Sequence, residues 1–190
     1  MNTFFLRDIP LSKIRHNDLP CYVEEGYGGR PIEEWPMYQF FAEYVHGEKE
    51  LAREKFEAWY LEQLSQYHHR PKIEGGMYTG SLYTLIEHIS GVPFLEATEL
   101  HKREAIKRRV AERFNLLENI KTQGYRPGVE RIDGIRKDGY VYLLGGHHRV
   151  AILSALGKEV LPQMMVFSNR FMYNLFTILR NIRILFKPKH

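Results

Sequence analysis

The run GGHHR at residues 145–149 brings together residue types that can bind a phosphate. It follows the apolar, β-prone residues 140–144 and precedes residues 150–156, whose apolar spacing is that of a helix with one buried face. The sequence therefore predicts a strand, a tight glycine turn and a helix N-terminus. A helix N-terminus favours anions, because its first backbone N–H groups have no partner within the helix and carry a partial positive charge.

Each residue of this run has a predicted role. The absence of side chains at Gly145 and Gly146 lets the backbone approach a ligand closely, and Arg149 offers a bidentate guanidinium. We predict that Gly145, Gly146, His148 and Arg149 bind the phosphates of a nucleotide, with the histidines as cationic or proton-donating groups. His147 is the predicted catalytic residue, as a proton shuttle or a stabiliser of the transferred group. The alternative is that Arg149 pairs with a carboxylate and His147 is a surface residue.

Two polar side chains on a preceding helix could add phosphate contacts. A helix is predicted over residues 103–123, ended by Gly124, because apolar residues recur at three- and four-residue steps: Ile106, Val110, Phe114, Leu117 and Ile120. Asn115 and Asn119 are four residues apart and so share one face of this helix. The alternative is that both belong to its polar surface.

A β-hairpin and a closing strand complete the second half. Residues 129–132 and 140–144 are the predicted strands, and Asp138-Gly139 is a strong hairpin-turn signal. Residues 160–167 follow as another strand. Helix, hairpin, glycine turn, helix and strand together predict an α+β unit.

The first half of the chain has a less regular pattern than the second. The predicted elements are a strand pair or a strand entering a loop at 3–14, a loop at 16–35, two helices within 36–67 separated at Gly47, a loop at 68–80, and a short helix from Ser81 to about Gly91.

Two segments resemble the ParB/sulfiredoxin-like superfamily. Residues 143–166, LLGGHHRVAILSALGKEVLPQMMV, are similar to the segment that these proteins use around nucleotide phosphates, and IPLSKI at 9–14 is similar to their first strand. The resemblance covers residues 3–18 and about 103–168. It implies an α+β fold with a small mixed sheet and helices in one domain, residues 1–168, interrupted by a helical insertion at about 20–100.

The motif distinguishes between branches of that superfamily. ParB partition proteins have Glu-Arg-Arg after the glycine, which is absent here, and sulfiredoxins have a reactive cysteine where this chain has His147. The ParB-like free-amino-acid kinases, with Gly-x-His-Arg, are the most similar in motif. The resemblance implies a kinase that transfers a phosphoryl group from ATP or ADP, with Mg²⁺, to a hydroxyl of a small molecule or sugar. A catalytically silent nucleotide-binding or partner-binding module, and a ParB-like nucleic-acid-binding protein, are the alternatives.

The same resemblance implies a catalytic base. These kinases place an acidic residue shortly after the Lys-Ile phrase, which corresponds to Asp18 here, with Glu24 and Glu25 as later alternatives. A carboxylate can accept the hydroxyl proton and help to hold Mg²⁺. The alternative is that Asp18 caps a turn before Pro20. The chain departs from the kinases at Gly145, where they have Asp, so either the metal is held elsewhere or the substrate differs.

The insertion is predicted to cover the nucleotide face and to form the acceptor pocket. Its Gly- and Tyr-rich loops carry the candidate substrate-binding residues Arg30, His68, His69 and Arg70. The histidines have no zinc-ligand spacing, so we assign no metal ligands.

Composition and the C-terminal segment bear on partners and location. The formal net charge is +4, too modest for a nucleic-acid-binding protein without a reading motif, so no nucleic acid is expected as partner. A single cysteine and the lack of a signal peptide or an apolar spanning run favour a cytoplasmic protein. Residues 169–190 predict a basic amphipathic helix, which would either lie on the anionic inner membrane face or pack on protein. The membrane alternative would suit a kinase in cell-surface polysaccharide assembly.

Overall fold

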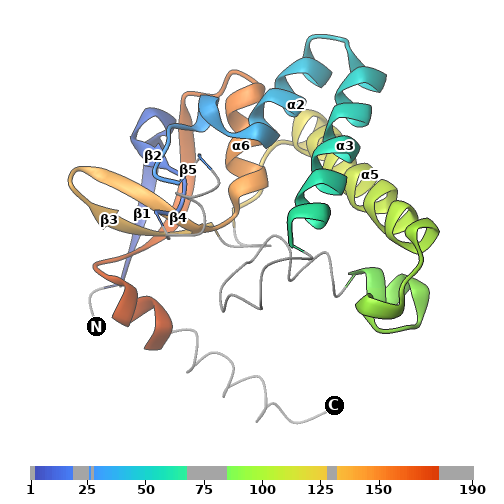
Figure 1. The fold of residues 1–190 in the computed structure, drawn as a ribbon. Coiled ribbons are helices and arrows are strands. Elements are labelled where there is room, and N and C mark those ends of the chain that lie inside the picture. Colours follow the sequence, from blue (N-terminus) through green and yellow to red (C-terminus); the bar gives the residue numbers. More distant parts are fainter. Residues whose placement is uncertain (1–2, 19–25, 27, 68–84, 128–131, 176–190) are drawn as a thin grey trace, which may run out of the picture. The chain divides into compact units, whose positions relative to one another are not determined.

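The computed structural model describes residues 3–18, 26, 28–67, 85–127 and 132–175. The chain divides into two compact units. We call residues 1–38 and 125–190 the sheet unit, and residues 39–124 the helical unit. The prediction of an α+β protein is confirmed, with strands and helices in a mixed arrangement (Figure 1).

The sheet unit contains a five-stranded sheet in the order β1-β5-β3-β4-β2. Its strands are β1 (Thr3–Pro10), β2 (Ile14–Arg15), β3 (Asp133–Lys137), β4 (Tyr140–Gly145) and β5 (Val160–Phe167), with helix α6 (His147–Ala155) between β4 and β5. Short 3-10 helices occupy Leu11–Lys13 and Ile32–Glu34.

The pairing of the strands determines where their ends meet. β1 is antiparallel to β5, β3 is parallel to β5 and antiparallel to β4, and β2 is parallel to β4. Because β2 and β4 are adjacent and parallel, their carboxyl ends lie at the same edge of the sheet. The residues that follow these two strands are therefore neighbours, although they are far apart in sequence.

The predicted β3–β4 hairpin is confirmed, with a shift at its first strand. Asp138 and Gly139 have φ of 51° and 79°, the left-handed conformation of a tight hairpin turn. The strand expected at 129–132 falls mostly outside the described residues; in the described part β3 begins at Asp133, and Ile132 is a buried residue before it. Residues 129–131 lie outside the described part of the chain.

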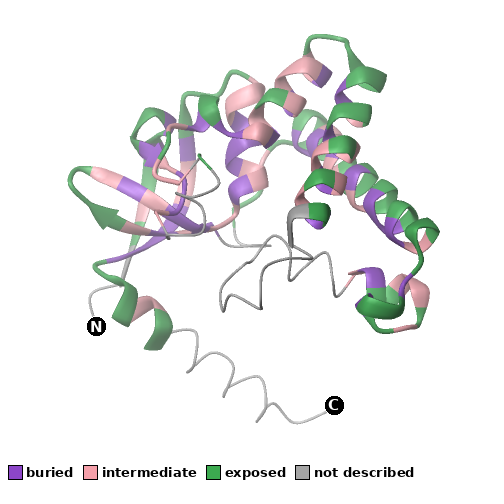
Figure 2. Ribbon diagram, in the orientation of Figure 1, coloured by how far each residue is buried: buried purple, intermediate pink, exposed green. Residues whose placement is uncertain are grey.

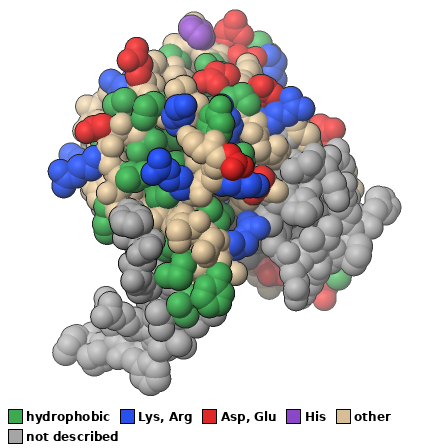
Figure 3. Space-filling view, turned by 90° about the vertical axis from the view of Figure 1, so that its left-hand side faces the viewer, with side chains coloured by type: hydrophobic (Ala, Val, Ile, Leu, Met, Phe, Trp, Pro, Cys, Tyr) green, Lys and Arg blue, Asp and Glu red, His purple; other side chains and the backbone are tan. Residues whose placement is uncertain are grey.

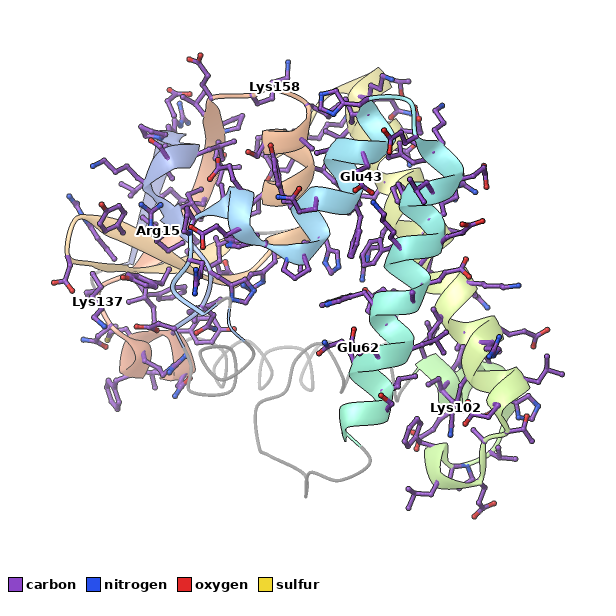
Figure 4. The ribbon with its side chains drawn as sticks, turned by 45° about the horizontal axis from the view of Figure 1, so that its top comes forward. Arg15, Glu43, Glu62, Lys102, Lys137 and Lys158 are labelled. Carbon is purple, nitrogen blue, oxygen red and sulfur yellow. The ribbon has the colours of Figure 1, made fainter. Side chains whose placement is uncertain are left out.

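Helix α6 forms as predicted. Val150, Ala151, Ile152 and Leu153 are buried (Figure 2), and Gly157 follows the helix with φ of 70°. Two views place α6 alongside the sheet (Figures 1 and 4).

The helical unit is built around aromatic side chains. Its helices are most of α2 (Pro36–Val45), whose first three residues belong to the sheet unit, α3 (Lys49–Tyr67) and α5 (Glu99–Gln123). A 3-10 helix at Phe94–Glu96 precedes α5. The ring of Phe114 lies 5.7 Å from that of Phe41 and 6.0 Å from that of Phe56, in edge-to-face geometry. All five apolar positions predicted for the face of α5 are buried.

Helix α5 differs from the expectation in its start and in the unit to which it belongs. Helix α5 begins at Glu99, four residues before the predicted start, because the hydroxyl of Thr98 accepts from the backbone N–H of His101 and caps it. Moreover, α5 belongs to the helical unit with α3, whereas the resemblance groups it with the strands. That the insertion covers a nucleotide face concerns the placement of the two units and stays a prediction.

The expected C-terminal helix falls mostly outside the described residues. Residues 170–175 are helical, with Phe171 exposed, and residues 176–190 are not described. In the described part of the chain, no helix is both long enough and apolar enough to cross a membrane.

Candidate functional site

The glycine turn between β4 and α6 has the predicted geometry. Gly146 is the N-cap of α6 with φ of 86°, and its carbonyl oxygen accepts from the backbone N–H of Val150 at 3.1 Å. A Cβ at Gly146 would lie 2.7 Å from Cγ1 of Ile132, so a side chain there would clash as well as strain the backbone. Gly146 has no side chain and so provides no side-chain cap for this N-terminus. Its first backbone N–H groups are thus suited to an anion.

Two buried histidines lie behind the turn. His16 follows β2 and His147 follows β4, and their ring centroids are 4.5 Å apart. The indole of Trp35 lies 5.1 Å from the ring of His16 and 5.8 Å from that of His147, and its Nε1 donates to the carbonyl oxygen of Arg30 at 3.0 Å. His16 and Trp35 are fully buried, and His147 exposes only 6% of its surface. We call these three residues the His–Trp cluster.

Burial keeps both histidines neutral near pH 7. Desolvation lowers the pKa of His16 to about 4, against the weaker opposing effect of a hydrogen bond with the Asn17 backbone. The pKa of His147 lies well below 6.5, first because of burial and then because of the neighbouring His16. The expectation that His147 contributes positive charge to the turn is therefore corrected. Its role in catalysis stays a prediction, and the cation closest in sequence to the turn is Arg149.

The remaining residues of the run are only partly exposed. His148 and Arg149 are half-buried on the first turn of α6, and Gly145 has open space where a Cβ would be. Partial burial raises the pKa of Tyr125, and the charge of Arg149 opposes this effect, so the phenol and the guanidinium are near one another. No sequence signal identified Tyr125 or Trp35 as neighbours of the turn.

A carboxylate also reaches the end of β4. Asp133, the first residue of β3, is paired with Gly145 across the β3–β4 ladder and is half-buried. Asp133 was not predicted as a site residue, because it lies just beyond the strand predicted at 129–132.

Asp18 lies in a different environment. Its Oδ2 accepts from Nζ of Lys137 at 3.0 Å, and both residues line a cleft of about 300 Å³ in the sheet unit. None of residues 145–149 lines that cleft. His16 and Asn17 are consecutive, yet His16 joins the His–Trp cluster while Asn17 lines the cleft. The predicted base and the predicted phosphate site are thus not brought into one cleft.

The other predicted site residues are dispersed. Arg30 is exposed and its guanidinium pairs with the carboxylate of Glu34 at 2.6 Å. Asn115 and Asn119 are exposed on α5 in the helical unit, and their contact with phosphate stays a prediction. His68, His69 and Arg70 lie outside the described residues, as do Glu24 and Glu25.

Among the described residues, no group of three or more His, Cys, Asp or Glu side chains could hold a metal ion. A Mg²⁺ ion bound mainly by nucleotide phosphates needs only one or two carboxylates from the protein. Asp133 could supply one of them at the end of β4.

Comparisons of the chain with protein-family models, with curated proteins and with solved structures found no match.

Proposed function

We propose that this protein binds a nucleotide through its phosphates at the 145–149 turn and transfers a phosphoryl group to a hydroxyl acceptor. The observation that carries the proposal is the N-terminus of α6, whose N-cap is a left-handed glycine that provides no side-chain cap and that Ile132 crowds too closely for a larger residue. The sequence resemblance to the ParB-like kinases supplies the nucleotide and the reaction. The finer assignment of the sheet to the ParB/sulfiredoxin-like fold is part of the same proposal.

The charges near the turn support an anionic ligand. Arg149 is half-buried on the first turn of α6, where its guanidinium and the backbone N–H groups can contact the same phosphate. The neutral His147 can donate or accept one hydrogen bond without adding charge. Asp133, in register with Gly145, is the residue that would hold Mg²⁺ on the phosphates and so compensate for the glycine.

In the proposed reaction the acceptor oxygen forms a bond to the terminal phosphorus of ATP as the bond to the leaving ADP oxygen breaks. The hydroxyl proton passes to a base, for which Asp18 remains the predicted residue. ADP as donor would leave AMP in the same way. The acceptor is a small molecule or a sugar.

A silent nucleotide-binding module is the second candidate, and one observation favours it. The carboxylate of Asp18 is paired with Lys137 in a cleft that residues 145–149 do not line. If that pairing persists in the presence of nucleotide, the carboxylate of Asp18 is not available as base, and binding would occur without transfer.

The binding half of the proposal is tested by calorimetry with ATP and Mg²⁺. Arg149→Ala should weaken ATP binding by about 10–100-fold, because a charge-assisted contact contributes roughly 1.5–3 kcal/mol. Arg7→Ala removes an exposed arginine from β1 and serves as the matched control, with unchanged affinity expected. Equal ATP affinity in wild type and Arg149→Ala would contradict the proposal.

The transfer half is tested by phosphate release and by phosphorylation of a panel of hydroxyl compounds. Asp18→Asn should lower kcat by about 10²–10⁴-fold and leave ATP affinity unchanged, because a base acts on the acceptor in the transition state. ATP binding that requires Arg149, with no turnover on any acceptor, would instead support the silent module.

A further inference from the structure

The cleft that contains Asp18 is a second candidate site, separate from the glycine turn. It has a volume of about 300 Å³, which is at the small end of the range for ligand pockets. Ile135 and Tyr142 are directly paired on β3 and β4, and Lys137 and Leu144 lie two residues further along these strands. Side chains two residues apart share a face of a sheet, so these four form the floor and wall of the cleft on one face.

The lining is rich in positive charge. Arg136, Lys137 and Arg170 are among the residues that line the cleft, and Asp18 contributes the one carboxylate among its described lining residues. Nη2 of Arg170 donates to the side-chain oxygen of Asn17 at 3.3 Å, and a neutral acceptor of this kind positions the guanidinium without neutralising it. Asn17 is buried, so this arginine is held by a fixed partner.

The ion pair between Lys137 and Asp18 is partly exposed to solvent. The side chains of Lys137 and Asp18 expose 57% and 37% of their surfaces, so solvent weakens their attraction. An external anion that reaches Lys137 would therefore compete with Asp18 at small cost. A ligand anion placed there would gain a contact with Arg170 that Asp18 does not make in the structure.

The cleft also offers apolar surface. Leu144 is buried, Ile135 and Tyr142 are half-buried, and Nζ of Lys137 lies 5.6 Å from the Tyr142 ring centroid. The space-filling view from the hairpin side shows Lys and Arg side chains standing among hydrophobic ones (Figure 3). An apolar floor beneath cationic groups suits a molecule that has one anionic group and an apolar or aromatic body.

We infer that this cleft binds a small organic anion, a carboxylate or a phosphate ester, whose charged group displaces Asp18 from Lys137 and contacts Arg170. The inference does not depend on the proposed function, because no residue of the 145–149 turn lines the cleft.

The first experiment measures binding of four probes of similar size by NMR titration. Benzoate and phenyl phosphate are the anions, and benzyl alcohol and benzylamine are the neutral and cationic controls. The protein carries Arg149→Ala, so that binding of phosphate at the turn is suppressed. We expect both anions to bind at least about tenfold more tightly than the controls and to shift signals of Tyr142 and Leu144.

The second experiment tests the residues. Lys137→Gln and Arg170→Gln should each weaken benzoate binding by about three- to tenfold, the range for charge contacts that solvent screens in part. Asp18→Asn should strengthen it by a similar factor, because the competing carboxylate is gone. Lys158→Gln makes the same charge change at an exposed lysine that does not line the cleft (Figure 4), and its affinity should match that of the parent.

Equal binding of benzoate and benzyl alcohol, or benzoate affinity unchanged in Lys137→Gln and Arg170→Gln, would overturn the inference. Weaker benzoate binding in Asp18→Asn would also overturn it. Failure of ATP to bind wild-type protein would count against the proposed function alone, since none of these titrations uses a nucleotide.

Discussion

The imidazole rings of His16 and His147 lie 4.5 Å apart in a setting that admits little water. Two protonated imidazoles at this distance would repel one another, and burial penalises each charge separately. The rings therefore serve the turn as neutral hydrogen-bonding and packing groups. This has a direct consequence for stability in acid.

We predict that acid destabilises the fold through these histidines. The unfolded chain binds a proton at His16 near pH 6.5, whereas the folded chain binds it only near pH 4. Because the unfolded state binds more protons between these values, the free energy of unfolding falls as pH drops from about 6.5 to 4. The loss from His16 alone should be about 3 kcal/mol, since one pKa unit corresponds to roughly 1.4 kcal/mol. His147 adds in the same direction.

Urea unfolding between pH 7.5 and 4.5 measures this effect. His16→Gln keeps a polar side chain but cannot be protonated, so its stability should depend less on pH. His46→Gln, at an exposed histidine of the helical unit, should retain the wild-type pH dependence. The same slope in wild type and His16→Gln would show that the buried ring does not titrate as described.

At the residue scale the sequence identified the glycine turn correctly and missed its surroundings. The run GGHHR lies between strand and helix because its glycines and flanking apolar residues specify that geometry locally. The ring of His147 lies 5.8 Å from that of Trp35, and Asp18 pairs with Lys137, which is 119 residues away. Contacts of that range follow from the strand order, which single-residue patterns do not contain.

The junction of β4 and α6 illustrates how an element fixes the conformation of one residue. Gly145 and Gly146 are consecutive, but only Gly146 has positive φ and only its absent Cβ would meet another residue, Ile132. Gly146 therefore determines where α6 begins, while Gly145 continues β4.

We predict that Gly146→Ala destabilises the protein by about 1–3 kcal/mol, because a left-handed alanine is strained and its Cβ would lie 2.7 Å from Ile132. Gly145→Ala is the matched control. It places a methyl group in open space at ordinary φ and should be neutral or stabilising by up to about 1 kcal/mol. Chemical denaturation of both variants measures the difference. Equal stabilities would mean that α6 can begin without a left-handed residue.

The elements that the sequence predicted well are those with local signals. The β3–β4 turn followed from Asp138-Gly139, and the apolar face of α5 followed from its helical spacing. The start of β3 was missed because it contains Asp133 and Gly134, two residue types that strands disfavour. Gly134 belongs there for a tertiary reason, since a Cβ would lie 2.6 Å from the side chain of Val141.

On the scale of the whole molecule, the sheet unit consists of two separate segments, 1–38 and 125–190, and the helical unit is the segment between them. The resemblance predicts an insertion at about 20–100, whereas the helical unit runs from 39 to 124 and includes α5. The spacing of apolar residues identifies a buried helix face but does not identify which elements cover it. In α5 that face contributes Phe114 to a cluster of rings from α2 and α3.

Each unit has its own core, and this leads to the last prediction. Phe56 is fully buried in the helical unit, where its ring stacks on Tyr60 at 5.0 Å and contacts Phe114. Phe167 is fully buried at the end of β5 in the sheet unit. Phe56→Leu and Phe167→Leu should each cost about 1–3 kcal/mol, because each leaves a partial cavity in a packed core. Amide hydrogen exchange under native conditions should then speed up mainly within 39–124 for Phe56→Leu and mainly within the sheet unit for Phe167→Leu, since local opening follows cooperative units. The two variants serve as controls for each other. Faster exchange in both units in either variant would show that the chain opens as one cooperative body.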